Sequence, residues 1–400
     1  MTHHVLKSLT SNNALIVGFL ALSSFIYKST ALTLFDNSTY AVFALLLSVA
    51  NLCSGLYIFV FGDIGLLRKN KWSSRTKLNY ITTSLFLINI LAVFVGIIFL
   101  YTYSSFVHGS YLYVILFIAC VSFFQYQKSL FYIFDRRYLP LIFSTVYLIS
   151  SLGFLAYGRI YEFTIGLNGL FVYIIIVTSL MLLISSTWIA IKGIEFPKLS
   201  GEPFGLSIDN LKSACMYVLI WIASQGQWFV LGVWAGMEIV GMTLGLLILA
   251  GPLQLIERIL QPKYLIELSH ESDNFQKLNI FMKFFVRNLL ILTSVFVLLV
   301  AYSNNLFDLI LPKRNYDHSL LYHLYFISIA QVGTSGLSSI NRSRSKYKSI
   351  FLAYSISPLV LFSYLYLLKD SLEIETLLNG LIISLVVQLF ILTISSFNNK

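Results

Sequence analysis

Two long apolar runs joined by a short polar turn constrain this chain more than any other feature. The first run covers residues 13–34 and holds one cation, Lys28, and the second covers residues 40–67 and holds Asp63. The turn between them reads Asp36-Asn37-Ser38-Thr39. Because a membrane-spanning helix needs about 20 mostly apolar residues, this stretch is predicted to be a membrane hairpin. Five cations follow the hairpin: Arg68, Lys69, Lys71, Arg75 and Lys77.

The same arrangement returns about 200 residues later in the chain. There an apolar run reaches Trp234, a short turn follows at Gly236-Met237-Glu238, and a second long run leads to Arg258 and Lys263. A hairpin that recurs halfway along a membrane protein is typical of a transporter with two repeated halves.

The composition supports a membrane protein throughout. Hydrophobic residues make up 58% of the chain and charged residues 11%, against about 25% charged in soluble domains. The first apolar run is long enough to span, so no cleavable signal peptide is expected. The cysteines Cys53, Cys120 and Cys215 all fall within apolar runs, so neither a disulfide framework nor a metal site is predicted.

Twelve apolar segments are long enough to be membrane-spanning helices. They cover residues 13–34, 40–67, 80–103, 111–134, 139–158, 168–191, 211–235, 238–261, 279–303, 319–340, 348–368 and 374–396. The sequence therefore predicts an all-α polytopic membrane protein.

The distribution of cations predicts the orientation. If both termini are cytoplasmic, 20 of the 27 lysines and arginines lie in cytoplasmic segments, four lie in the opposite loops, and Lys28, Lys128 and Arg287 lie within spans. This is the bias that cytoplasmic loops of membrane proteins show. The net charge of +10 is thereby explained by topology, and no nucleic-acid partner is expected.

The longest polar break divides the chain into nearly equal halves. Its glycines, prolines and mixed charges indicate a linker. We therefore expect an N-terminal six-helix bundle at residues 1–195, a cytoplasmic linker at 196–210 and a C-terminal six-helix bundle at 211–400. The loops are too short for a folded domain outside the membrane, which needs about 50 residues.

The sequence contains none of the common catalytic or nucleotide-binding motifs. We therefore expect no enzyme activity, no catalytic residue, no cofactor and no metal. Without a nucleotide site, the energy for transport must come from an ion gradient or from the downhill movement of the substrate.

Charged residues inside the spans are the first candidates for a site, because charge at bilayer depth is costly. Lys28 is expected in the outer half of the first span, facing either a cleft or, by snorkelling, the headgroups. Arg287 shares a helical face with Lys283 and offers either an anion-binding surface or a snorkelling pair. Arg258 lies near a cytoplasmic end, where snorkelling is favoured. Asp63 either pairs with a neighbouring cation or takes up a proton.

Amides inside the spans are the second set of candidates. Gln225 and Gln227 fall in the seventh segment and Gln254 in the eighth. Each amide needs a hydrogen-bond partner in hydrocarbon, which a neighbouring helix can also supply. Together, the cations and amides suit a ligand that carries hydroxyls and anionic groups.

The two hairpins also carry a resemblance to a known family. The stretches LTLFDNSTYAVFALLLSVANLCSGLYIFVFGDIGLLRK and LGVWAGMEIVGMTLGLLILAGPLQLIERILQPKYL, together with twelve spans, resemble the Wzx-type polysaccharide flippases. That family belongs to the MOP superfamily, which includes the ion-coupled MATE multidrug exporters. Tyr40-Ala41 and Val240-Gly241 take the place of the Tyr-Gly pair that commonly opens the second helix of each hairpin.

The resemblance implies two six-helix bundles around a central cleft lined by spans one, two, seven and eight. It implies translocation of undecaprenyl-diphosphate-linked oligosaccharide repeat units across the bacterial inner membrane, for O-antigen or capsular polysaccharide synthesis. Lys28, Asp63, Gln225, Gln227, Gln254 and Arg258 fall on those four spans, and Arg287 falls on span nine. The expected partners are this substrate, membrane lipids, a proton or sodium ion at Asp63, a glycan polymerase and a chain-length regulator.

Two other functions stay open at this stage. A multidrug exporter of the same superfamily would share the fold. A glycan polymerase would usually carry a long external loop with catalytic residues, and the external loops here are short, although one holds Asp308, Lys313, Arg314 and Asp317.

Overall fold

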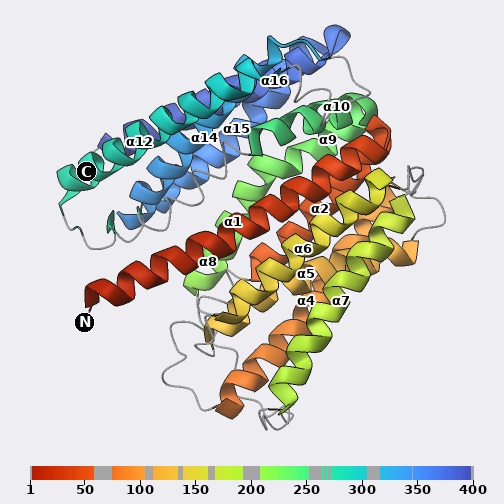
Figure 1. Cartoon of the computed structure of the whole chain (residues 1–400). Coiled ribbons are helices and arrows are strands. Elements are labelled where there is room, and N and C mark those ends of the chain that lie inside the picture. The colour runs from red at the N-terminus through yellow and green to blue at the C-terminus, as the bar shows by residue number, and fades with distance from the viewer. Residues whose placement is uncertain are drawn as a thin grey trace. The chain divides into compact units, whose positions relative to one another are not determined.

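Figure 1 shows the computed structural model of the chain. The structure describes residues 2–57, 74–103, 111–133, 138–160, 167–191, 208–251, 264, 267–268, 271, 273–303, 316–344 and 346–397. Every regular element in these ranges is helical. The all-α prediction is thus confirmed for the described part of the chain.

Helices occupy each of the twelve apolar segments. Towards the N-terminus they are α1 (Thr2–Leu34), α2 (Asn37–Tyr57), α4 (Ser74–Tyr103), α5 (Tyr111–Ile133), α6 (Tyr138–Ile160) and α7 (Leu167–Ile191). Next come α8 (Ile208–Trp221), the π-helix η3 (Ile222–Gly226), α9 (Gln227–Trp234), α10 (Met237–Leu247) and the 3₁₀ turn η4 (Ile248–Ala250). The last are α12 (Asn274–Ala301), α14 (Leu320–Ser343), α15 (Tyr347–Leu367), η5 (Lys369–Ser371) and α16 (Ile374–Phe397).

Hydropathy and length agree with a protein that crosses the membrane several times. Within the described residues, 5 helices are long and apolar enough to span, and further shorter apolar helices accompany them. α1 begins at Thr2 rather than at residue 13, where its apolar run starts. The reason is that apolar composition marks the part inside hydrocarbon, whereas backbone hydrogen bonding continues beyond it.

The described residues form two compact units. The first contains residues 1–41 together with 222–400, and the second contains residues 42–221. The first unit thus joins α1 to the C-terminal half of the chain. The predicted linker at 196–210 lies mostly outside the described residues, and the bundle boundaries placed around it stay a prediction.

The core of the first unit is built from α12, α14, α15 and α16, which run side by side (Figure 1). α14 lies at the centre of this group, with Ser328, Thr334 and Asn341 buried along it. Hydrogen bonds satisfy much of this polarity: the Asn341 side chain donates to the carbonyl of Leu392, 3.1 Å away on α16. Buried hydroxyl and amide groups of this kind link helices within a bilayer.

Cations after α14 hold the end of α16. The guanidinium of Arg344 donates to the carbonyl of Ser396, and the Lys346 Nζ donates to the carbonyl of Ser395 at 2.8 Å. Positive side chains at a helix C-terminus satisfy its free carbonyls and complement its dipole. Burial lowers the pKa of Arg344, and the attraction of Asp273 opposes that change. Arg344 and Lys346, in the basic cluster at residues 342–348, therefore stabilise the end of α16. The same cluster contributes to the charge bias from which the cytoplasmic side is predicted.

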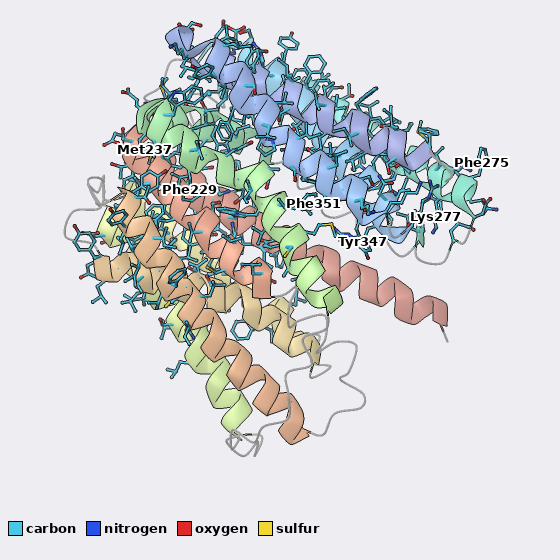
Figure 2. The ribbon with its side chains drawn as sticks, turned by 180° about the vertical axis from the view of Figure 1, so that it is seen from behind. Phe229, Met237, Phe275, Lys277, Tyr347 and Phe351 are labelled. Atoms are coloured by element: carbon cyan, nitrogen blue, oxygen red, sulfur yellow. The ribbon has the colours of Figure 1, made fainter. Side chains whose placement is uncertain are left out.

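One end of this helix group is rich in aromatic and basic residues. Figure 2 labels Phe275 and Lys277 at the first turn of α12, and Tyr347 and Phe351 on the first part of α15. Phe275 is exposed, whereas Lys277 is buried. Asp273 caps α12 by accepting a hydrogen bond from the backbone N–H of Phe275 at 3.1 Å.

In the second unit, α5 packs between α4 and α7. Phe117 lies at its centre, with its ring centroid 6.1 Å from that of Phe43 and 4.9 Å from that of Phe171. The Tyr217 hydroxyl and the Trp221 Nε1 donate to carbonyls of α2, at 2.9 and 3.1 Å. These bonds join α8, at the end of the unit, to its first helix.

Candidate functional site

The first turn of the predicted hairpin is confirmed by its capping bonds. Both carboxylate oxygens of Asp36 accept from Thr39, one from the backbone N–H at 2.7 Å and one from the hydroxyl at 3.1 Å. An Asp at this position satisfies amide groups that would otherwise lack partners at a helix start. α1 therefore ends and α2 begins within three residues.

The second predicted turn is confirmed at Gly236. Its φ of 91° lies in the region that side chains rarely adopt, which explains why glycine stands there. Five residues later, Gly241 lies against the backbone of Asn37, so closely that a Cβ at position 241 would overlap the Asn37 carbonyl. The two turns that echo each other in sequence thus meet in space, within the first unit.

The seventh apolar segment is a helix with a π-helical turn inside it. α8 and α9 are separated by the π-helix η3, which contains Ser224, Gln225 and Gly226. Short π-helical segments inside an α-helix are frequent at functional sites, because they disturb the regular backbone bonding and turn side chains to new directions. Gln225 lies on this turn and is half-buried, and Gln227 follows it at the start of α9 and is buried.

The eighth apolar segment also departs from regular α-helical geometry. α10 gives way at Ile248 to the 3₁₀ turn η4, and the N–H of Gly251 bonds to the Ile248 carbonyl. Pro252 follows in the sequence and has no N–H to donate, so a continuous α-helix would lose a bond there. α1 packs on this break: Phe25 lies 3.3 Å from the Cβ position of Gly251.

The turns η3 and η4 lie at a similar depth. At 1.5 Å of rise per residue, η3 ends about 15 Å from Gly236, and η4 begins about 18 Å from it. Half the thickness of a bilayer core is about 15 Å. Interrupted helices near the midplane are where many transporters bind substrate and ions. We therefore place the candidate site at η3, η4 and the facing part of α1.

Three predicted residues lie on these elements. Gln227 is 3% exposed, and its Oε1 has no hydrogen-bond partner among the described residues. Gln225 is half-buried on η3. Lys28 is half-buried on α1, three residues after Phe25 and so on the helical face that meets η4. Ser29, the next residue, also has a buried hydroxyl oxygen without a partner.

This set of side chains defines what the site can bind. An ammonium group attracts anions, and amides both donate to and accept from hydroxyls. A buried polar group without a partner costs about 1–3 kcal/mol, so Gln227 is held there at a cost to stability. Among the described residues, no cluster of His, Cys, Asp or Glu has a geometry for a metal ion.

The remaining predicted residues are placed elsewhere or lie outside the described ranges. Arg287 and Lys283 are both exposed on α12, beside exposed apolar residues such as Val286 and Leu290. Their alternatives, an anion-binding surface or snorkelling, both remain predictions. Asp63, Gln254 and Arg258 lie outside the described residues, so the roles assigned to them also remain predictions.

The sequence analysis did not predict the π-helical turn η3 or the 3₁₀ turn η4. It treated residues 211–235 and 238–261 as continuous helices because both are apolar throughout. The available signals were the polar group Ser224-Gln225-Gly226 and the pair Gly251-Pro252, each in the middle of a span.

No family model matches the chain, and no curated protein matches it in sequence. Solved structures do match it over nearly its whole length. The eukaryotic MATE transporter AtDTX14 is 14% identical, with a TM-score of 0.65, covering 97% of this chain and 94% of that one. An inward-facing multidrug resistance MATE family transporter of the MOP superfamily has 13% identity, a TM-score of 0.65 and coverages of 96% and 97%.

A MOP superfamily transporter from Pyrococcus furiosus is 12% identical, with a TM-score of 0.59 and coverages of 97% and 93%. The chain has the MATE transporter fold. These neighbours are transporters rather than enzymes. The MATE fold and the apolar helices together support a multi-pass membrane protein.

Proposed function

We propose that this protein translocates lipid-linked oligosaccharide repeat units across the bacterial inner membrane, for O-antigen or capsular polysaccharide synthesis. The substrate carries an undecaprenyl chain, a diphosphate and sugars. The proposal is carried by one observation, the sign of the charges inside the described helices.

Within the described helices, a cation lies inside a helix, whereas carboxylates lie near helix starts. In the named α-helices, the acidic residues Asp209, Glu238 and Glu375 stand in first turns, and Glu267 lies at a separate helical position outside them. Lys28, by contrast, lies well inside α1 and on the face toward η4. A site for cationic drugs would need buried anionic partners, whereas an ammonium at this depth favours a diphosphate.

Transporters that share this fold differ in the polarity of their binding pockets. The Pyrococcus furiosus neighbour is described by a reverse polarity of its binding pocket, which suggests a different function for that protein. We infer that charge sign and polarity determine the substrate class here too. The amides of Gln225 and Gln227 suit sugar hydroxyls, which both donate and accept hydrogen bonds.

In the proposed mechanism, the diphosphate pairs with Lys28 while the amides of η3 and α9 bind the first sugars. Pairing removes the cost of each charge at bilayer depth, so the headgroup can cross while the site opens to one side and then to the other. Arg258 would attract the headgroup from the cytoplasmic end. Asp63 would couple the cycle to a proton or sodium ion, and a polymerase with its chain-length regulator would receive the product.

The test is deletion of the protein in its host, followed by analysis of lipid-linked sugars. Accumulation of single repeat units on the inner leaflet, with loss of surface glycan, is the expected result. Single repeats on the outer leaflet would instead identify a polymerase. An unchanged glycan profile would reject the flippase proposal.

The alternative is a multidrug exporter, which the names of several structure neighbours favour. This alternative predicts that the deletion strain becomes sensitive to cationic dyes and that expression restores resistance. Our proposal predicts no change in dye resistance.

A further inference from the structure

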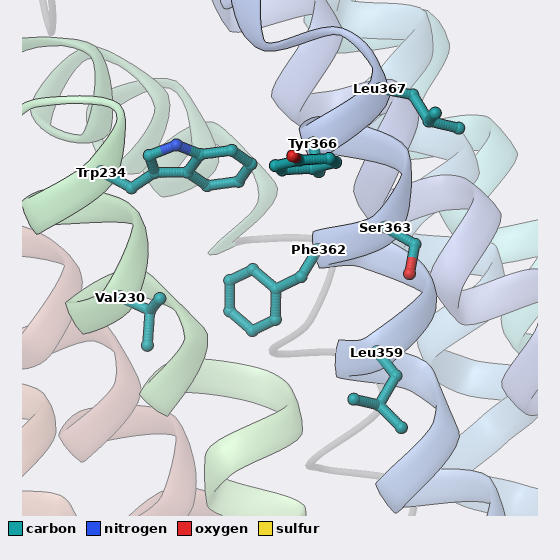
Figure 3. Close-up of a pocket in the computed structure, with 7 residues that line it drawn as sticks. All are labelled: Val230, Trp234, Leu359, Phe362, Ser363, Tyr366 and Leu367. Carbon is teal, nitrogen blue, oxygen red and sulfur yellow. The ribbon is translucent and has the colours of Figure 1, made fainter.

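A groove lies along the first unit between α9 and α15. Its volume is about 580 Å³, and its lining is almost entirely apolar: Val230, Trp234, Leu359, Phe362, Ser363, Tyr366 and Leu367. Figure 3 shows Trp234 and Tyr366 facing each other across it, with Phe362 projecting between the two helices. Both helices belong to segments apolar enough to span a membrane, so the groove is open to hydrocarbon.

The groove residues follow helical stripes. On α15 they recur at positions 359, 362, 363, 366 and 367, and on α9 at positions 230 and 234, which are the spacings of one helix face. From Leu359 to Tyr366 the stripe is about 10 Å long. Leu359, Tyr366 and Val230 are all more than half exposed, so the described protein leaves this apolar surface uncovered.

A positive charge stands at one end of the groove. The ring centroids of Trp234 and Tyr366 are 6.4 Å apart, and the Nζ of Lys369 lies 5.8 Å from the centroid of Tyr366. Lys369 follows the last turn of α15, at the end opposite the basic residues 342–348. The predicted orientation places that end at the outer leaflet. Interfacial aromatics alone would explain Trp234 and Tyr366, but not the apolar channel below them.

We propose that this groove binds the polyprenyl chain of the lipid-linked substrate in the outer leaflet, with the phosphate beside Lys369. The groove is lined by aliphatic and aromatic side chains, which suit a branched, unsaturated chain. The ammonium at its end supplies the complementary charge for an anionic headgroup. The inference rests on the proposed function and adds a position for the tail.

The groove also adjoins the candidate site. α15 packs on the π-helix η3, which precedes Val230 in the chain. On α9, Val230 and Trp234 face the groove, while Gln227 is turned into the protein. A substrate whose tail lies in the groove would therefore have its headgroup near the outer end of the helix that carries the amides.

The test uses the purified full-length protein in phosphatidylcholine nanodiscs and a diazirine-bearing polyprenyl diphosphate. Leu359→Trp fills the groove and should lower photolabelling about tenfold, a change of about 1.4 kcal/mol. Leu290→Trp on α12 is the matched control, since Leu290 is 65% exposed and Leu359 is 64% exposed. Lys369→Gln should weaken labelling by the diphosphate but not by an uncharged polyprenol probe, and Lys369→Arg should retain both.

Three results would overturn the inference, and each has a different meaning. Equal labelling of both tryptophan variants, at sites outside the groove, would reject the groove and leave the flippase proposal standing. Competition by phosphatidylglycerol as effective as that by unlabelled polyprenyl phosphate would identify a phospholipid groove instead. Labelling no stronger than that by a diazirine phospholipid would reject polyprenyl recognition and weaken the proposed function, which the deletion assay measures independently.

Discussion

At the scale of single residues, the interior of this protein is distinguished by polar groups that its own contacts do not satisfy. Gln227 and Ser29 each bury an oxygen without a partner, while the hydroxyls of Thr30 and Thr243 donate to backbone carbonyls of their own helices at 2.8 Å. Buried polar groups are normally paired. Other described residues, such as Asn288 and Gln388, also bury an atom without a partner, so Gln227 and Ser29 are candidates for ligand binding because of their place near η3 and on α1.

The charge of Lys28 is expected to determine transport. Lys28→Ala should lower flipping about tenfold or more, since a hydrogen bond to a charged group contributes about 1.5–3 kcal/mol, whereas Lys28→Arg should retain most activity. The measurement is accumulation of inner-leaflet repeat units in the deletion strain carrying each variant. Equal activity of the two variants would show that the cation serves only membrane anchoring.

The amide of Gln227 is expected to serve binding rather than folding. Gln227→Met removes a buried oxygen that has no partner, so the melting temperature of the purified protein should stay the same or rise. Flipping should nevertheless fall severalfold. A lower melting temperature together with unchanged flipping would assign Gln227 to helix packing.

At the scale of elements, close packing and end capping hold the helices in place. The turn at Gly236 and the contact of Gly241 with Asn37 join the two hairpins. Arg344 and Lys346 hold the last turn of α16 against the start of α15. These contacts hold helix ends at the Gly236 turn and at the end of α16. The turns η3 and η4 lie farther along the two segments that meet at Gly236.

A methyl group at position 241 is expected to separate α10 from the start of α2. Gly241→Ala should lower the melting temperature, because the added carbon overlaps backbone that cannot move independently. Gly18→Ala on α1 is the control: nothing lies within 4 Å of its Cβ position, and alanine favours a helix by about 1 kcal/mol over glycine. If both variants had the same stability, the close contact would be disproved.

The clamp on α16 is expected to contribute measurably to stability. Lys346→Met should cost about 1–2 kcal/mol, through loss of a charged hydrogen bond to the Ser395 carbonyl. Lys348→Met, at an exposed position in the first turn of α15, should cost little. Thermal unfolding of both variants in detergent provides the comparison, and similar melting temperatures would argue against a clamp.

At the scale of the whole molecule, the chain has the MATE fold, and its apolar helices agree with a multi-pass membrane protein. Structure neighbours with 12–14% identity share the fold but include a protein described by a reversed polarity of its binding pocket. Because function on a shared fold depends on local chemistry, we propose that the cation and the amides near η3 and η4 select the substrate.

The orientation of the molecule is expected to follow its cations. A cysteine-reactive, membrane-impermeant reagent applied to intact cells should label a cysteine placed at Glu238 but not one placed at Lys348. The native cysteines are replaced by alanine for this measurement. Labelling at Lys348 alone would reverse the predicted topology and exchange the two leaflets in the groove proposal.

The helices of this protein could be predicted from its sequence. Apolar runs of about 20 residues can satisfy their backbone groups in lipid only as helices, and each predicted segment overlaps a described helix, although residues 58–67 and 252–261 lie outside the described part. The two turns could also be predicted from the sequence. In the structure, Asp36 caps a helix at the first turn and Gly236 adopts a positive φ at the second. The number of membrane crossings and the boundaries of the two bundles stay predictions.

Which residues come together depends on the packing of the helices and could not be predicted from the sequence. The π-helix η3, the contact of Gly241 with Asn37, the packing of α1 on η4 and the groove between α9 and α15 depend on neighbours far apart in the chain. Hydropathy does not distinguish a residue that faces lipid from one that faces protein, because both environments are apolar. The sequence could therefore place Lys28, Gln225 and Gln227 at membrane depth, but only packing showed which of them face a break in the helices.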